Sequence, residues 1–210
     1  MRGKAYWYCL SGHLNYCFVE PLKYGMDTVK LTCHPTTPCK AVYHIRAQVS
    51  TSNTGTLTLR YTLDGDIGDL RVPIEATPRR ADNLWQHTCF EAFIAAMDAV
   101  GYHEFNFAPS GEWAVYRFDA YRKGMTAIEA AQPIITMHRA AQHLVLEVVV
   151  DLKPFLGFKG HAELRLALSA VIEESNGRLS YWALAHPPGK PDFHHADGFT
   201  LALDQRGRLA

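Results

Sequence analysis

The sequence has no excess of either charge. Its 210 residues include 21 Lys or Arg and 21 Asp or Glu, so the formal net charge is zero. Partners such as nucleic acids and anionic membranes select proteins with a basic excess, and we expect neither partner here. No stretch approaches the run of about 20 apolar residues that a membrane-spanning helix needs.

Closely spaced cysteines are also missing. The chain has no Cys-x-x-Cys pair, and an odd number of scattered cysteines is a poor disulfide framework. Polar residues at 11–15 interrupt the apolar N-terminal stretch, which is therefore not typical of a secretory signal. We expect reduced thiols and a cytoplasmic protein. The five cysteines are Cys9, Cys17, Cys33, Cys39 and Cys89.

The motifs of several large enzyme classes do not occur. There is no Gly-x-Ser-x-Gly elbow, no phosphate-binding Walker loop and no dinucleotide-binding Gly-x-Gly-x-x-Gly. We therefore predict a protein that is not an enzyme and that carries no cofactor.

What is present is one short run of strand-forming residues after another. Each run is rich in β-branched and aromatic residues and is bounded by turn signals such as Asn176-Gly177. This pattern predicts an all-β fold, an antiparallel β-sandwich formed as a single domain by residues 26–210. Residues 1–25 lack the pattern and precede Met26, so we expect them to be an extension outside the fold, and Met26 to be the true start. The expected strands include Ala41–Ser50, Thr56–Leu63, Trp85–Ala95, Tyr102–Ala108, Glu112–Asp119, His143–Val150, Leu164–Glu173 and Ser180–Ala185.

The central strands predict two faces of different chemistry. Alternate side chains of a strand point to opposite faces, so Phe90 and Ile94 on one strand and Phe105 on the next are expected between the sheets. The opposite face then carries Glu91 and Asn106, together with further polar groups. The residues expected on this polar face are Glu91, Glu104, Asn106 and Arg117.

Such a face has the composition of a sugar site. Sugar rings stack their C–H faces on indoles, and their hydroxyls pair with carboxylate, amide and guanidinium groups. Trp85 and Trp182 are candidate stacking plates. The alternatives remain a tryptophan that belongs to the core and a Glu91–Arg117 pair that is only a cross-strand ion pair.

Three segments carry a resemblance to a known family. They are LWQHTCFEAFI at 84–94, YHEFNFAPSGEW at 102–113 and YWALAHPP at 181–188. They resemble the DOMON-like domains, which are similar to the family 9 carbohydrate-binding modules, and the resemblance is strongest to bacterial stand-alone members. It extends over about residues 26–204.

The resemblance implies an immunoglobulin-like or jelly-roll sandwich that binds a sugar or haem. In the sugar-binding relatives, a sugar unit lies between two tryptophans and is held by a glutamate and arginines. Trp85 and Glu91 match this pattern by spacing. Trp182 matches as the second plate because it lies on a late strand, as in the family. Arg117 matches by residue type and rough place only, and Arg165 matches less well than Arg117. The implied ligand-binding set is Trp85, Glu91, Asn106, Arg117, Arg165 and Trp182.

Two alternatives stay open at this point. The first is a haem protein, because the haem-binding relatives use a Met and a His, and the chain offers Met97, Met125 and Met137 besides 11 histidines. The second is a metal-dependent enzyme using loop histidines, for which the candidate ligands are His186, His194 and His195, or Cys33, His34 and Cys39.

Glu91 and Glu104 share the residue type of a glycosidase pair, but such a pair must flank a bond at a set separation within a cleft. Carboxylates that share a sheet face more often serve binding or solubility, so we do not expect catalysis by these two residues. Exposed strand edges could also pair two copies of the chain, so we expect a possible homodimer alongside the small-molecule ligand.

Overall fold

In the described part of the chain, strands are the main regular structure, with only short helical segments between them. The computed structural model of the protein describes residues 28–52, 54–129, 132–156 and 163–204, so the expected extension 1–25 lies outside the described residues. The elements are β1 (Thr28–Cys33), β2 (Val42–Thr51), β3 (Thr56–Gly65), η1 (Ile67–Asp69), η2 (Leu84–Gln86), β4 (Cys89–Ala96), β5 (Tyr102–Phe107), β6 (Trp113–Phe118), β7 (Thr126–Ala127), β8 (Ile134–Arg139), β9 (His143–Asp151), α1 (Lys153–Leu156), β10 (Leu164–Glu173), β11 (Leu179–Ala183), η3 (Ala196–Gly198) and β12 (Leu201–Leu203).

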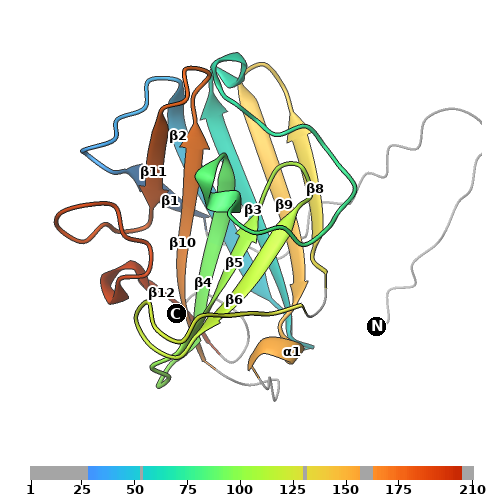
Figure 1. Cartoon of the computed structure of the whole chain (residues 1–210), viewed down its shortest axis with the longest axis vertical. Coiled ribbons are helices and arrows are strands. Elements are labelled where there is room, and N and C mark those ends of the chain that lie inside the picture. Colours follow the sequence, from blue (N-terminus) through green and yellow to red (C-terminus); the bar gives the residue numbers. More distant parts are fainter. Residues whose placement is uncertain (1–27, 53, 130–131, 157–162, 205–210) are drawn as a thin grey trace, which may run out of the picture.

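The strands form two layers that β1 connects. The first sheet has the order β1-β2-β3-β9-β8, and the second has the order β7-β6-β5-β4-β10-β11-β1, with β12 on β10. Residues 28–31 of β1 pair with β2, whereas Thr32 and Cys33 pair with β11. All ladders between the named strands are antiparallel. In Figure 1 the strands β10, β4, β5 and β6 of the second sheet lie in front of β3, β9 and β8.

The main core lies between the two sheets. Each sheet contributes alternate residues of its strands, which the predicted pleat had placed there. Phe90, Ile94 and Phe105 are fully buried in this core, as expected, and they meet Leu59 and Tyr61 of the first sheet. Burial of one such side chain stabilises the fold by about 1.5–3 kcal/mol. The predicted antiparallel β-sandwich is confirmed.

The outer face of the second sheet is covered as well. A smaller cluster on this face contains Phe93, Tyr102 and Phe118, and the side chains of Phe193 and Phe199 pack against it. These last two belong to the segment 186–199, which follows β11 and which we call the cap segment. Leu84 of η2 packs against the same cluster from another part of the chain. The sandwich therefore has a third, partial layer made of loops.

One predicted strand begins later than expected. The segment Trp85–Ala95 was expected to be extended throughout, but Leu84–Gln86 form the short helix η2 and β4 begins only at Cys89. Asn83 precedes η2 in the left-handed conformation, with φ 63°, which asparagine tolerates better than most residues. Figure 1 shows η2 lying over β4. The pleat argument therefore does not apply to Trp85.

The expected turn at Asn176-Gly177 is present between β10 and β11. Gly177 has φ 86°, a conformation that costs a residue with a side chain more than it costs glycine. The amide of Gly177 donates to the carbonyl of Glu174, which closes the turn. This turn fixes the register that pairs Ala170 with Trp182.

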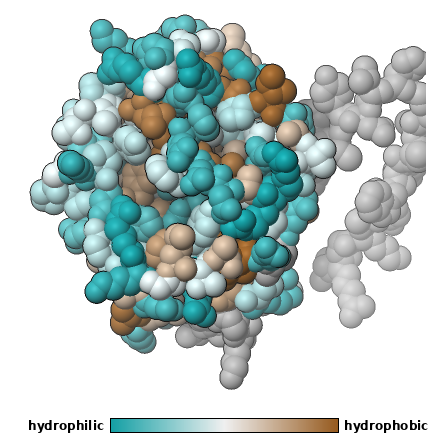
Figure 2. All heavy atoms as spheres, in the orientation of Figure 1, coloured by the Kyte–Doolittle hydropathy of each residue, from teal (hydrophilic) through white to brown (hydrophobic). Residues whose placement is uncertain are grey.

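On the face that Figure 2 shows, apolar side chains are scattered among polar ones. The large exposed apolar residues come from separate parts of the chain, and they include Ile74, Trp85, Val100 and Tyr121. Among the described residues, none of the helices has the length and apolar character required to cross a membrane.

Candidate functional site

Three polar residues predicted on one face do lie there together. Glu91 of β4 pairs with Asn106 of β5, and Phe93 pairs with Glu104. All of them point to the outer face of the second sheet, because their neighbours Phe90 and Phe105 point to the inner core. The strand pleat thus places two carboxylates and one amide side by side.

These groups are nonetheless almost inaccessible. Glu91 is 2% exposed and Asn106 is 1% exposed. The amide of Asn106 donates to Oε1 of Glu104 at 2.7 Å, and the hydroxyl of Ser169 donates to Oε2 of Glu91 at 3.4 Å. Among the residues that the structure describes, no lysine or arginine forms an ion pair with Glu91 or Glu104. Burial of charge without a cation is costly, so these carboxyls resist ionisation.

The pKa values express this cost. Burial raises the pKa of Glu91 well above its usual value, and the neighbouring Glu104 carboxylate raises it further. Burial also raises the pKa of Glu104, although the hydrogen bond from Asn106 opposes the shift. The Arg122 charge also opposes the shift of Glu104, but it does not cancel the effect of burial, so both adjacent acids keep raised pKa values.

The cap segment supplies the cover. Nδ1 of His194 and the hydroxyl of Tyr102 share a hydrogen bond of 2.9 Å. The imidazole ring of His194 also packs edge-on against the rings of Phe93 and Phe118. Nε2 of His194 lies 3.7 Å from Glu104. Burial, with a contribution from the Arg122 charge, lowers the pKa of His194 to about 4, so the imidazole is neutral near pH 7. His194 therefore seals the face without neutralising the acids.

The two predicted stacking plates do not face each other. Trp182 is 5% exposed and belongs to the core between the sheets, because it pairs with the inward-facing Ala170. Its indole N–H donates to the hydroxyl of Ser180 at 3.0 Å. Trp85 is 46% exposed and lies on η2 at the outer face. The expected sandwich of a ligand between Trp85 and Trp182 is wrong, because a whole sheet separates them.

The two predicted arginines also occupy different places. Arg117 shares the strand parity of the core residue Val115, opposite to that of Glu91, and it pairs with Asp119 at 3.2 Å. The expectation that it joins Glu91 is wrong for this reason. Arg165 does lie on the outer face, where it pairs with Ala95 at the far end of β10.

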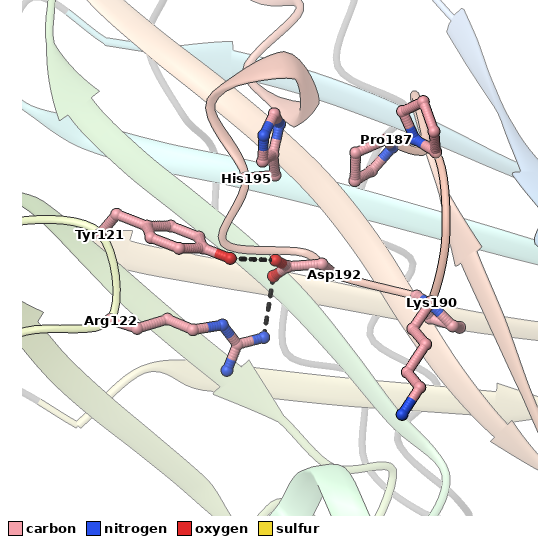
Figure 3. A pocket seen from close by; sticks show the side chains of 8 residues that line it. Tyr121, Arg122, Pro187, Lys190, Asp192 and His195 are labelled. Atoms are coloured by element: carbon pink, nitrogen blue, oxygen red, sulfur yellow. Dashed lines mark hydrogen bonds and ion pairs between the residues drawn. The ribbon is translucent and has the colours of Figure 1, made fainter.

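A groove that sequence reasoning missed lies beside the outer face of the second sheet. It lies between the turn that follows β6, residues 119–124, and the cap segment (Figure 3). We call it the Tyr121 groove; its volume is about 450 Å³, within the range of small-ligand sites. It is lined by Tyr121, Arg122, Pro187, Pro188, Lys190, Pro191, Asp192 and His195.

Asp192 joins the two walls of the groove. Its carboxylate accepts a hydrogen bond from the hydroxyl of Tyr121 and another from the guanidinium of Arg122, the latter at 2.8 Å. It also accepts one from the backbone amide of His194 at 3.1 Å. In Figure 3, Asp192 stands between Tyr121 and Arg122 on one side and Pro187 and Lys190 on the other. Burial alone would raise the pKa of Asp192, but these hydrogen bonds and the Arg122 charge together hold it below its usual value.

A second, smaller depression of about 220 Å³ adjoins the first and shares Tyr121 and His195 with it. Arg165 contributes to its lining, with its guanidinium donating to the carbonyl of Ala99 at 3.0 Å and lying 5.7 Å from the ring of Phe199. The sequence analysis singled out His186, His194 and His195, which belong to the cap segment, as candidate metal ligands. The turn at 121–124 gave no signal, because nothing in the sequence shows that it meets Asp192.

The loop histidines do not form a metal site. His186 bonds to the carbonyl of Thr32 at 2.8 Å, while His195 lies beside Asp197 at 3.4 Å. Within the described ranges, no group of three or more His, Cys, Asp or Glu side chains could hold a metal ion. The expectation of a metal-dependent enzyme based on these histidines, or on Cys33, His34 and Cys39, is therefore wrong for this part of the chain.

Comparison with known proteins points to the fold alone. No family model matches the chain, and none of the curated proteins matches it either. Among solved structures, it is similar to a protein from Bacteroides uniformis named a "putative carbohydrate-binding protein", with a TM-score of 0.60 and 12% identity over 83% of this chain and 84% of that one.

Two further solved structures are a family 9 carbohydrate-binding module from Caldicellulosiruptor kristjanssonii in complex with cellotriose and with glucose. The cellotriose complex has a TM-score of 0.47 and 10% identity over 78% of this chain and 75% of that one. The glucose complex has a TM-score of 0.44 and 9% identity over 78% and 76%. What the comparisons establish is that this chain shares the β-sandwich of the Bacteroides uniformis protein.

Proposed function

We propose that the protein is a non-catalytic binder of a small sugar and that the ligand lies in the Tyr121 groove. The observation that carries the proposal is the exposed ring of Tyr121 beside the Asp192–Arg122 ion pair in an open hollow. Tyr121 is 50% exposed although its hydroxyl is fixed by Asp192. A held aromatic face next to fixed polar groups is what a sugar ring requires.

The chemistry of the groove fits hydroxyl-bearing ligands. Arg122 uses one nitrogen on Asp192 and keeps other N–H groups for a ligand. Lys190 and His195 add donors on the opposite wall. Pro187, Pro188 and Pro191 restrict the backbone of that wall, so little conformational entropy is lost when a ligand binds.

The residues proposed from the sequence supply a second location on the same face. Trp85 is exposed on η2, and η2 contacts β4 and β5, the strands that carry Glu91 and Asn106. Because both polar residues are covered, a ligand could reach them only after movement of the cap segment or η2. A sugar stacked on Trp85 with Glu91 and Asn106 below it therefore stays a prediction, which the same experiment tests.

The non-catalytic part of the proposal rests on accessibility. A glycosidase needs two carboxyls facing a substrate across a cleft. Glu91 and Glu104 are only 2% and 6% exposed, so neither is open to a substrate. We expect no turnover when the protein is incubated with a panel of chromogenic glycosides.

Binding is tested by titrating purified protein with mono- and disaccharides and following backbone amide shifts by NMR. The shifts are expected at residues 119–124 and 186–196. Tyr121→Ala should weaken binding about tenfold or more, which is the loss of a good stacking contact. Tyr43→Ala is the matched control, because Tyr43 is similarly exposed and its hydroxyl also donates to an aspartate, Asp66, but on the first sheet.

The outcomes separate the two locations. If Trp85→Ala abolishes sugar binding and Tyr121→Ala does not affect it, the ligand binds beside Trp85 on η2. The proposal that it binds in the Tyr121 groove is then wrong. If no sugar shifts any amide at millimolar concentration, the proposed function is wrong as a whole.

A further inference from the structure

The Tyr121 groove and its adjoining depression have an unbalanced charge. Three permanently or ordinarily charged cations line them: Arg122, Lys190 and Arg165. The single lining carboxylate is Asp192, and both of its oxygens accept hydrogen bonds from the protein. The whole chain has no net charge, so the local excess of positive charge does not reflect a basic composition. It arises because the fold brings these three cations together.

Nearby acids do not cancel the excess. Asp119 faces Arg117 at 3.2 Å, and Asp197 faces His195 at 3.4 Å. Each therefore has a basic neighbour outside the set of three cations. Glu104, beneath the cap segment, is buried and its pKa is raised.

Lys190 is the cation without a partner. It is exposed, and its side chain forms no hydrogen bond or ion pair with any residue in the described ranges. It stands on the wall opposite Arg122, across Asp192 (Figure 3). A charge of this kind, facing an open hollow, is available to a ligand.

Arg122 is held in place from several directions. Its backbone has φ 52°, a left-handed conformation that is unfavourable for a residue other than glycine. The turn is closed by the amide of Lys123 donating to Ala120, and the amide of Arg122 donates to the hydroxyl of Tyr102 at 3.2 Å. The turn therefore fixes the backbone of Arg122, and the hydrogen bond to Asp192 holds its guanidinium at the groove.

We propose that the Tyr121 groove selects a sugar that bears an anionic group, a phosphate or a carboxylate, and that Lys190 and Arg122 bind this group. The inference rests on the proposed function and names the ligand class for the same site. Guanidinium and ammonium groups form charge-assisted hydrogen bonds with both anions, and these are stronger than bonds to neutral hydroxyls.

The test compares glucose, glucose 6-phosphate, glucuronic acid and inorganic phosphate by isothermal titration calorimetry at low and moderate salt. One of the two charged sugars is expected to bind about tenfold or more tightly than glucose at low salt. The ratio of its affinity to that of glucose should fall at moderate salt, because salt screens the charges of the groove. The preferred sugar then tells whether phosphate or carboxylate is recognised.

Lys190→Gln removes one charge without removing the groove. It should lower the ratio of charged-sugar affinity to glucose affinity by about three- to tenfold. Lys30→Gln is the matched control, since Lys30 is an exposed lysine on β1, and it should leave the ratio unchanged. Arg122→Lys keeps the charge but not the planar fork, and should weaken the charged sugar less than Lys190→Gln if charge alone is recognised.

Two failures are distinguishable. Equal affinities for glucose and both charged sugars, with no effect of Lys190→Gln, overturn the anion inference while the sugar-binding proposal stands. Binding of inorganic phosphate in the absence of any sugar binding overturns the proposed function and leaves an anion site. No binding of any of the four probes overturns both.

Discussion

Replacement of Trp182 by alanine should destabilise the protein strongly, whereas replacement of Trp85 should have little effect on stability, although the sequence predicted that both belong to one site. Trp182 is buried between the sheets, and its indole N–H is bonded to Ser180. Truncation of such a residue to alanine removes apolar burial and leaves a cavity, which costs about 3–5 kcal/mol. This is a large share of the total stability of a domain, about 5–15 kcal/mol. Trp85 has about half of its surface exposed, so Trp85→Ala should cost no more than about 1 kcal/mol.

The assay is urea unfolding at 25 °C, followed by far-UV circular dichroism so that the removed chromophore does not bias the signal. Trp182→Ala should lower the midpoint strongly with an unchanged denaturant slope. Trp182→Phe keeps most of the apolar volume, and it should cost about 1–3 kcal/mol and leave sugar affinity intact. A loss below about 1 kcal/mol for Trp182→Ala, together with lost sugar binding in folded protein, would refute the placement of this side chain in the core.

Three further perturbations follow from individual contacts. Because the pKa of Glu91 is raised on folding, wild-type stability should fall as pH rises from the unfolded-state value of about 4.5 through the folded-state value. Glu91→Gln removes this dependence, so its gain in melting temperature should be larger at pH 8 than at pH 5, and an equal gain contradicts the burial argument. Asp192→Asn should speed hydrogen exchange in the cap segment while changing global stability by about 1 kcal/mol or less, since the ion pair that it loses is partly exposed; unchanged exchange in the cap segment would show that Asp192 does not hold it. In Gly65→Ala, the new Cβ would lie 2.2 Å from the carbonyl oxygen of Ala41, so the β2–β3 ladder must shift at a cost of about 1–3 kcal/mol, and a neutral urea midpoint would exclude this close approach.

Several features of the fold could be predicted because they depend on neighbouring residues only. The alternation along β4 and β5 separates Phe90 and Phe105 from Glu91 and Asn106, whatever the rest of the chain does. The turn residues Asn176-Gly177 identify a hairpin by local conformational preference. These predictions are confirmed by the core that the two sheets share.

Trp85 was misplaced for a local reason that the strand pattern hides. Asn83 adopts a left-handed conformation and starts a short helix, so the residues before Cys89 leave the strand. An aromatic residue next to a strand is predicted to belong to that strand when only composition is considered. The direction of the Trp85 side chain is then set by the contacts of η2 with β4 and β5. Local conformational preferences do not predict such tertiary contacts.

The face of Trp182 was decided by register. The segment Tyr181-Trp182-Ala183 shows no clear alternation of polar and apolar residues. The sequence therefore does not indicate which of its side chains face the core. The ladder with β10 places Trp182 opposite Ala170, and Ala170 opposite Phe90, which turns the indole inward. A shift of one residue would have turned it outward.

By itself the sequence determined the strand-rich sandwich and the polar outer face, since both follow from side-chain alternation and turn chemistry within a few residues. Only the tertiary structure decided that this face is covered, that Trp85 and Trp182 are on opposite sides of a sheet, and that a groove opens at Tyr121. The groove joins Arg122 to Asp192, which are 70 residues apart in the chain. Contacts of such separation depend on how loops pack after the sheets have formed, and no local preference encodes them.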